Sequence, residues 1–580
     1  MAVVRQTDNR PARHRAASTA VVPGARGTLR NLPRPVYLVT ALFGMTMVCW
    51  SFLMPTGRSA DEIYHADAGI YLAEHGEWPG FKQLPVTFAP RTPETLGMKD
   101  PVTGASYPPL LAASAIPRGE RPAYADLRRA EPSGVNNLGQ HPPLYYAMLG
   151  AVHTVLPPST ELVAEIWWYR LLNALILTPL PLLAAALART WGGSRPIVLA
   201  ASWSVFLVPQ LAVLGGAVNN DNLLTASAAW VFFGLALVAA GDLRRRTALW
   251  VGVSLAVALL SKAFGLLLLP LAALAVLVGW RTTGRLRPAA RSAALMAAVA
   301  MLGGWWWVHT YLRYGTLQPS GHLPPIEGGP LPVSEGIGPT LEGLFTVVPV
   351  RFWAFLSIKD GVDAFPMALS VTLTIVSAAL VATMLLRRRV GAADRSVTWS
   401  FTVPLLLIVM VLASQILRLY LTTGVVRGLN GRYLFFALLP VLVLVVLSLP
   451  PLVRGRERLV TATVMAGGLL FTGWSAQRAL GYHWGADRTF EPVADLRGVE
   501  AWSPFVPPVT VTVGAVALVV AAVAVWASVR SLLAGNPDFP AAPAGRHSQG
   551  PRTKTGDDAG PQEDRVTPAD AGLEAPAGSA

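Results

Sequence analysis

The chain has 580 residues, of which 53% are hydrophobic and only 14% are charged. Soluble domains carry about 25% charged residues, so this deficit and the mean hydropathy of +0.45 predict a polytopic membrane protein and exclude an ordinary soluble enzyme. The net charge of +14 comes largely from short arginine clusters between apolar runs, a pattern that sets membrane orientation and does not indicate nucleic-acid binding. The single cysteine, Cys49, excludes a disulfide framework or a cysteine metal site within one chain.

The N-terminal part predicts a tail, a first span and a large loop. Residues 1–35 are Arg-rich and polar, which is typical of a disordered cytoplasmic tail and not of a cleavable signal peptide. The first span is expected at 36–54 and runs outward. Residues 55–165 are then extracytoplasmic and too long for a simple connection, so we expect them to form a small cap. Within the cap we expect an irregular stretch at 79–109 and short helices at 60–75 and 143–156, the second lying at the interface.

The rest of the chain predicts eleven further spans of about bilayer length. With the first span they make twelve, so both termini are expected in the cytoplasm and every arginine cluster falls on that side. The expected fold is therefore an all-α polytopic membrane protein. Its body covers 36–530, with further outer loops at 313–365 and 476–508, and residues 531–580 form a disordered cytoplasmic C-terminal tail. The eleven spans are expected near 166–189, 195–214, 221–241, 247–261, 264–280, 292–312, 366–386, 398–417, 432–450, 459–475 and 509–529.

An acidic pair follows the first span directly. Ser59 and Glu62 have the spacing of a capping box, which predicts a helix beginning here. Asp61 and His65 lie four residues apart and would share a face of that helix. Asp61 would be kept ionised by the helix dipole. The alternative is that Asp61 and Glu62 only cap a surface helix.

Four further polar motifs are expected at the same membrane face. Ionisable and polar groups at membrane depth are costly and are usually functional. Each motif also has a structural alternative: a turn with interface tyrosines, a cap of the fourth span, a lysine that snorkels to the headgroups, or a phosphate anchor. A purely structural role for all of the motifs together is much less expected than a structural role for any one of them. The motifs contain His141 and Tyr146; Asn219, Asn220 and Asp221; Lys262; and Arg432 with the nearby Arg427.

The order of these motifs resembles a known superfamily. The chain is similar, over residues 36–530, to predicted membrane proteins of unknown function within the GT-C-type glycosyltransferases. It resembles more distantly the polyprenyl-phosphate-mannose protein mannosyltransferases. Members usually have proline before Asp-Glu and an Asn-Pro-Asp motif, whereas Ala60 and Asn220 stand at those places, which leaves the subfamily open.

The resemblance implies a polyprenyl-phosphate sugar donor and an inverting transfer at the outer face of the plasma membrane. In that superfamily a carboxylate in the first outer loop is the catalytic base. The resemblance assigns this role to Asp61, with Glu62 as the alternative. The base takes the proton of the acceptor hydroxyl, and cations stabilise the departing polyprenyl phosphate. Lys262 and Arg432 are the expected cations, with Arg427 and His65 as further candidates. The acceptor would be an envelope polysaccharide, glycolipid or protein. The residues expected to bind the donor phosphate or another part of the substrates are His65, His141, Tyr146, Asn219, Asp221, Lys262, Arg427 and Arg432.

Two other functions stay open at this point. A secondary transporter or lipid flippase would carry ionisable groups near the membrane midplane, often in repeats, whereas the centres of most predicted spans are uncharged and no repeat is evident. A non-catalytic envelope-assembly protein would tolerate alanine at Asp61, Lys262 and Arg432. No phosphate-binding loop or dinucleotide motif is found. A divalent cation bridging Asp61 and the phosphate is compatible with the sequence, but no metal ligands are assigned.

Overall fold

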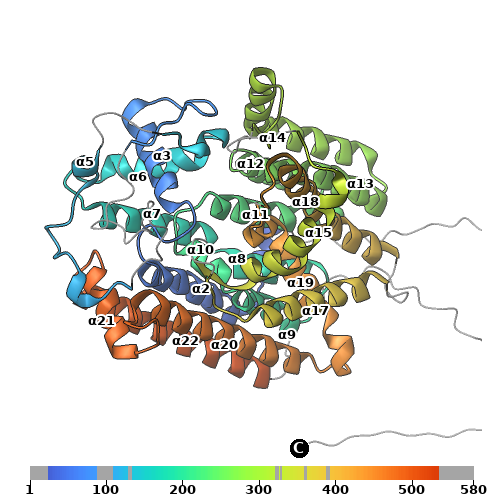
Figure 1. Ribbon diagram of the computed structural model, residues 1–580. Helices are drawn as coiled ribbons and strands as arrows, with labels where there is room; N and C mark the ends of the chain where they lie inside the picture. Colours follow the sequence, from blue (N-terminus) through green and yellow to red (C-terminus); the bar gives the residue numbers. More distant parts are fainter. Residues whose placement is uncertain are drawn as a thin grey trace, which may run out of the picture. The chain divides into compact units, whose positions relative to one another are not determined.

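The computed structural model describes residues 24–87, 109–128, 134–319, 326, 329–357, 362–386, 392–426 and 428–534. The chain divides into two units, Met1–Pro543 and Ala544–Ala580, and all described residues belong to the first. In this part of the chain nearly all regular structure is helical (Figure 1); the one sheet is the antiparallel pair β1 (Phe355–Ser357) and β2 (Val362–Asp363). The predicted all-α, multi-pass fold class is confirmed.

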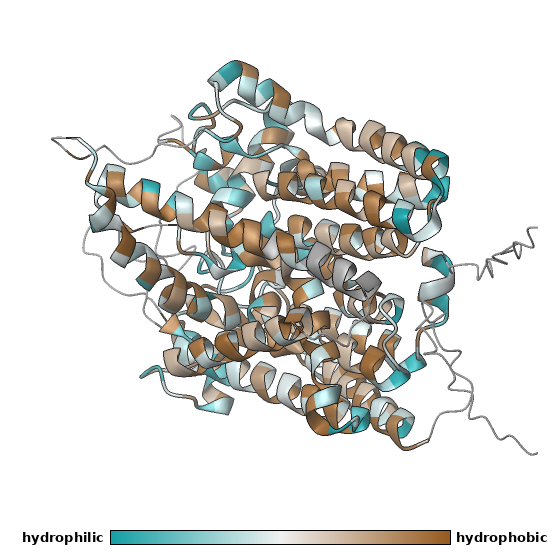
Figure 2. Cartoon of the chain, turned by 90° about the vertical axis from the view of Figure 1, so that its right-hand side faces the viewer, coloured by the Kyte–Doolittle hydropathy of each residue, from teal (hydrophilic) through white to brown (hydrophobic). Residues whose placement is uncertain are grey.

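Nine helices in the described part are long and apolar enough to cross a membrane, judged by length and composition. In Figure 2 the helices of the body are mainly brown to white, and hydrophilic residues gather at helix ends and in loops. The nine helices are Arg34–Leu53 (α2), Leu162–Thr190 (α7, Leu162–Leu177, and α8, Leu180–Thr190), Asp221–Ala239 (α11), Ala263–Thr283 (with α13, Leu268–Thr283), Met367–Met384 (in α17, Met367–Leu386), Leu406–Thr423 (in α18, Ala392–Thr423), Gly431–Val453 (with α19, Leu438–Ser448), Glu457–Trp484 (α20) and Pro507–Leu533 (α22).

These nine helices coincide with nine of the twelve predicted spans. The other three predictions fall on α9 (Arg195–Trp203) with α10 (Gln210–Gly215), on α12 (Arg245–Leu259) and on α14 (Leu286–Tyr314). α9 and α12 have 9 and 15 residues, fewer than the roughly 20 that a straight span requires. α14 has the length, with 29 residues, but is not among the sufficiently apolar helices. The count of twelve therefore stays a prediction.

The nine helices differ in how much of their surface the protein covers. In α11, 94% of the apolar window is buried inside the protein, against 6% in α22. A helix that is apolar all round must be covered either by protein or by lipid. α11 therefore forms the centre of the helical body, and α22 leaves most of its surface for the hydrocarbon core of the membrane.

The predicted first outer loop contains the two helices that the sequence predicts. α3 (Glu62–His75) packs against α6 (Leu144–Val155), and both lie at the same end of the molecule in Figure 1. Residues 79–87 of the predicted irregular stretch lack helix, and 88–108 lie outside the described residues. The remaining α-helices are short: α1 (Ala25–Arg30), α5 (Tyr124–Leu127), α15 (Val333–Glu342), α16 (Val348–Trp353) and α21 (Pro492–Trp502).

The predicted orientation can be tested by cysteine labelling. In a variant whose native Cys49 is replaced by serine, a cysteine at the exposed Ser114 should react with an impermeant maleimide on intact cells, because the first loop is predicted outside. A cysteine at the exposed Arg285 should react only after the cells are opened. The reverse pattern would contradict the predicted orientation.

Candidate active site

Asp61 occupies a strained turn between α2 and α3. It is the residue before the first turn of α3, and its backbone has φ 59° and ψ 8°, in the left-handed region. Non-glycine residues rarely adopt this conformation, although aspartate and asparagine tolerate it better than most. Its side chain makes no capping hydrogen bond to α3 and instead accepts one from Nη2 of Arg432, at 2.8 Å. The turn thus directs the carboxylate away from its own helix.

The predicted capping box is wrong. Ser59 does not cap α3, and the Glu62 carboxylate accepts hydrogen bonds from the backbone N–H groups of Gly57 (2.9 Å) and Val218 (3.1 Å). Its main partner is Arg170 of α7, which donates from Nε at 2.8 Å and from Nη2 at 2.7 Å. Glu62 is only 1% exposed, so a buried ion pair across the fold satisfies its charge more completely than a local cap could.

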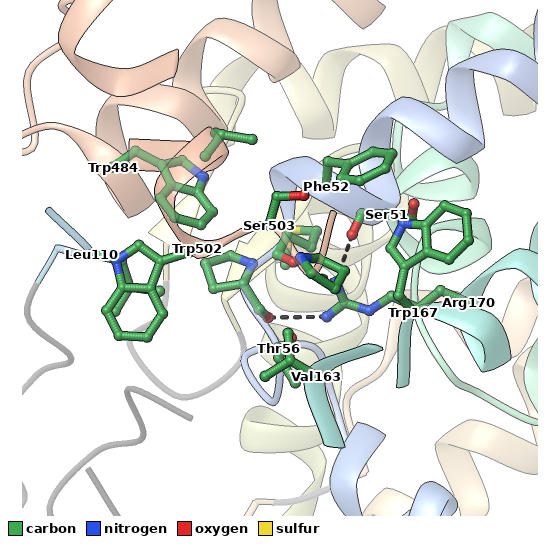
Figure 3. Close-up of a pocket in the computed structure, with 14 residues that line it drawn as sticks. Ser51, Phe52, Thr56, Leu110, Val163, Trp167, Arg170, Trp484, Trp502 and Ser503 are labelled. Atoms are coloured by element: carbon green, nitrogen blue, oxygen red, sulfur yellow. Dashed lines mark hydrogen bonds between the residues drawn. The ribbon is translucent and has the colours of Figure 1, made fainter. Parts of the chain in front are cut away.

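Arg170 uses its remaining donors inside the same turn. Its Nη1 donates to the carbonyls of Ser51 (2.7 Å) and Met54 (2.6 Å), and its Nη2 donates to the carbonyl of Pro55 (3.1 Å). Figure 3 shows Arg170 in the wall of an aromatic pocket, where the lining tryptophans are Trp167, Trp484 and Trp502. Because its donors are all engaged, Arg170 organises the turn before Asp61 and is not free to bind an anion.

Asp61, Asp221, Lys262 and Arg432 form one chain of ion pairs. Lys262 Nζ donates to Oδ1 of Asp221 at 2.6 Å, and Arg432 Nε lies 3.0 Å from Oδ2 of the same carboxylate. Arg432 then reaches Asp61 through Nη2, at 2.8 Å. The structure therefore brings together four predicted site residues from segments far apart in the sequence. Lys262 also lies 4.7 Å from the centre of the Tyr433 ring.

The members of this ion-pair chain differ sharply in exposure. The side chains of Asp221, Lys262 and Arg432 are 2%, 8% and 7% exposed, whereas that of Asp61 is 51% exposed. Partial burial raises the pKa of Asp61, but the charge and hydrogen bond of Arg432 outweigh it and hold the pKa below its ordinary value. Asp61 is thus an ionised carboxylate that a second molecule can reach. Asp221 is buried, so a second molecule cannot reach its carboxylate.

Three predicted residues form a buried layer behind Asp61. Tyr146 stacks on His65, with ring centres 5.8 Å apart, and its hydroxyl lies 3.3 Å from His65 Nδ1. Burial, reinforced by Arg432 and Lys262, lowers the pKa of His65 to about 3, despite the opposing charge of Asp61. Burial likewise lowers the pKa of His141. His65 is therefore neutral at pH 7 and cannot supply the positive charge that the sequence suggested.

Asn219 connects two parts of the site. Its Nδ2 donates to the carbonyl of Ala60 at 3.3 Å, and its Oδ1 accepts from the N–H of Asp221 at 2.9 Å. It thereby fixes the turn before Asp61 against the start of α11, which is a positioning contact. Arg427 lies outside the described residues.

A pocket free of acidic residues adjoins Arg432. Its lining includes Arg58, Arg351 and Arg432, together with Gln210 and Asn430, and contains no aspartate or glutamate. Arg432 Nη1 is buried and has no hydrogen-bond partner in the described structure. Three guanidinium groups without a lining carboxylate favour an anion, and arginine suits phosphate in particular.

Arg58 and Arg351 are the residues that sequence reasoning missed. Arg58 stands three residues before Asp61, a position that could have been noticed, whereas nothing local distinguishes Arg351 in the predicted outer loop 313–365. The approach of Arg351 depends on Gly431, because a Cβ there would lie 2.3 Å from the backbone N of Phe352. In the described residues, no group of three or more histidine, cysteine, aspartate or glutamate side chains could hold a metal ion.

A known family matches part of the chain. Residues 152–314 match the family described as dolichyl-phosphate-mannose-protein mannosyltransferase. The resemblance to the GT-C-type glycosyltransferases is confirmed. The matched segment contains α7 with Arg170, α11 with Asp221, and Lys262, which follows α12. No curated protein matches the chain in sequence.

Solved structures of low identity also resemble the chain. ArnT from Cupriavidus metallidurans bound to undecaprenyl phosphate is 15% identical, with a TM-score of 0.41, over 85% of this chain and 75% of that chain. The apo state of ArnT gives 13% identity, the same coverage and the same TM-score. The oligosaccharyltransferase of Archaeoglobus fulgidus with Zn and sulfate gives 13% identity and a TM-score of 0.38, over 76% of this chain and 53% of that chain.

Proposed function

We propose that this protein is a membrane glycosyltransferase that moves a sugar from a polyprenyl-phosphate donor to an envelope acceptor at the outer face of the plasma membrane. One observation carries the proposal: Arg432 joins an exposed, ionised carboxylate, Asp61, to a pocket lined by arginines and free of acids. The family match over 152–314 supports the same class of reaction and a lipid-linked donor.

The donor phosphate would bind in the pocket beside Arg58, Arg351 and Arg432. The sugar would then extend past Arg432 toward Asp61. An acceptor hydroxyl attacks the anomeric carbon while Asp61 takes its proton, and the bond between that carbon and the phosphate oxygen breaks with its electrons going to the phosphate. The arginines stabilise the negative charge that grows on the leaving polyprenyl phosphate, and attack opposite the leaving group inverts the anomeric carbon.

Lys262 would act through Asp221 on Arg432. Lys262 is not part of the pocket lining, and its Nζ is engaged by Asp221. Asp221 in turn holds Nε of Arg432, which leaves Nη2 for Asp61 and Nη1 for a ligand. This makes Lys262 a positioning residue in the proposal, whereas the sequence alone suggested a direct phosphate contact.

The phosphate site is tested by replacing Arg432 with glutamine. One charge-assisted hydrogen bond contributes about 1.5–3 kcal/mol, so donor Kd should rise about ten- to hundredfold. Transfer should slow as well, because phosphate is charged in the ground state and in the transition state. The measurements are binding of a radiolabelled polyprenyl-phosphate sugar to purified protein and transfer in membranes.

The same variant should also change the pH profile. Arg432 is the strongest influence that opposes burial at Asp61, so without it the pKa of Asp61 should rise and activity should disappear at a higher pH than in the natural protein. Arg497→Gln is the matched control, because Arg497 is an exposed arginine of α21, another predicted outer segment, and does not line the pocket. Equal donor binding by the Arg432 and Arg497 variants would remove the phosphate site from the proposal.

A further inference from the structure

A second basic pocket lies far from Asp61, between three helix ends. It is formed by the beginning of α9, the loop and first turn of α20, and the end of α22. Its polar lining contains Ser194, Arg195, Arg456, Glu457, Arg458 and Ser531. α20 has 28 residues and so spans about 42 Å at 1.5 Å per residue. Its other end, at Trp484, donates a hydrogen bond to the carbonyl of Leu53, near the Asp61 turn, so the pocket and the candidate active site lie at opposite ends of this helix.

Buried contacts fix the three helices around this pocket. Thr461 of α20 donates to the carbonyl of Pro196 of α9 at 2.8 Å. Trp203 of α9 donates through Nε1 to Ser528 of α22 at 3.1 Å. Because side chains on all three helices are tied together, the pocket is a feature of the packed body and not of an isolated loop.

The pocket carries an excess of positive charge. Arg195, Arg456 and Arg458 make no ion pair within the described residues, and the buried Nε of Arg195 has no hydrogen-bond partner there. The single carboxylate of the lining, Glu457, accepts a hydrogen bond from Ser194 at 2.5 Å. Three arginines against one engaged carboxylate leave the pocket ready for an anion.

Apolar groups border the arginines of this pocket. Leu199 and Leu532 are part of the lining. The neighbouring Leu459 and Leu533 are 48% and 75% exposed, on the two helices whose windows are only 33% and 6% buried by protein. A soluble anion would gain nothing from these side chains, whereas a lipid would place its acyl chains along them.

We propose that this pocket binds the phosphate headgroup of an anionic membrane lipid. Basic pockets between helix ends are typical binding sites for such headgroups. The arginines contact the phosphate, and α20 and α22 accommodate the acyl chains. The inference does not depend on the proposed transferase activity, because its residues lie at the opposite ends of the helices from Asp61.

The test measures lipid binding to the full chain in detergent micelles. The probes are short-chain phosphatidylglycerol, short-chain phosphatidylcholine and inorganic phosphate. Phosphatidylglycerol should bind more tightly than phosphatidylcholine, and inorganic phosphate should compete only weakly. Each arginine near a headgroup contributes about 1 kcal/mol, or about fivefold in affinity, so the triple variant Arg195→Gln, Arg456→Gln, Arg458→Gln should bind phosphatidylglycerol about a hundredfold more weakly.

Two variants keep the result interpretable. Arg454→Gln changes an exposed arginine of the same loop that does not line the pocket, and it should leave binding unchanged. Glu457→Gln removes the lining carboxylate and should tighten phosphatidylglycerol binding about fivefold, a gain that misfolding cannot produce. Equal affinity for the two lipids, an equal loss in the Arg454 variant, or no gain in the Glu457 variant would overturn the proposal. Competition by inorganic phosphate at the affinity of the lipid would overturn the lipid assignment and point to a soluble phosphate compound.

Discussion

Asp61→Asn should lower the rate of sugar transfer by about 10²–10⁴-fold, the usual contribution of a general base. The amide has the size of the carboxylate and tolerates the left-handed backbone at φ 59°, so the turn should keep its shape. The amide cannot accept the proton of the acceptor hydroxyl. Donor binding should stay close to normal, because the proposed phosphate contacts come from the arginines. The assay is transfer from a radiolabelled polyprenyl-phosphate sugar to a cell-envelope fraction.

The control for this variant is Asp487→Asn, which changes an exposed aspartate of another predicted outer segment. It should transfer sugar at the natural rate. Full activity in the Asp61 variant would show that Asp61 is not the base. A different outcome is an active Asp61→Asn variant and an inactive Glu62→Gln variant that is present at normal folded levels. That result would assign the role of the base to Glu62.

Glu62→Gln should primarily destabilise the protein. The change leaves the guanidinium of Arg170 charged, 2% exposed and without its counter-ion. Breaking a buried ion pair on one side costs about 3–5 kcal/mol, so we expect a lower thermal midpoint and less folded protein in membranes. Transfer measured per folded molecule should fall far less than in the Asp61 variant, because Glu62 points away from the ion-pair chain of Asp61, Asp221, Lys262 and Arg432.

A double variant separates charge from packing in this prediction. Adding Arg170→Met to Glu62→Gln removes the uncompensated cation and should recover part of the lost stability, since an apolar replacement of a buried pair is often tolerated. The measurement is the unfolding midpoint of the purified protein in detergent. A Glu62→Gln protein as stable as the natural one would contradict the structural role assigned to this pair.

The sequence predicted the helical architecture better than the details of the site. In a bilayer the backbone N–H and C=O groups must form hydrogen bonds within the protein, so an apolar run of bilayer length is expected to form a helix. Nine of the predicted spans accordingly coincide with apolar helices that are long enough to cross a membrane. α9 and α12 are too short for the same argument, and the sequence could not tell a short buried helix from a full span. The helices α3 and α6 of the predicted first outer loop were also expected from the sequence.

The errors at the site have a common physical cause. The capping box assigned Glu62 a partner three residues away, but its actual partner, Arg170, lies 108 residues away. Lys262 was expected to contact phosphate directly; in the structure it pairs with Asp221, and the phosphate contact stays a prediction. His65 was expected to carry charge, but burial removes it. Local spacing cannot reveal which buried charges neutralise one another across the fold, nor that Arg351 would join Arg432 in one pocket.

The account is tested most directly by a structure of the purified protein with a polyprenyl-phosphate sugar bound. The account predicts that the donor phosphate lies within hydrogen-bonding distance of the Arg432 guanidinium, in the pocket shared with Arg58 and Arg351. It also predicts that the anomeric carbon faces the Asp61 carboxylate. A donor bound elsewhere, with its sugar out of reach of Asp61, would contradict the proposed site and the role of its base.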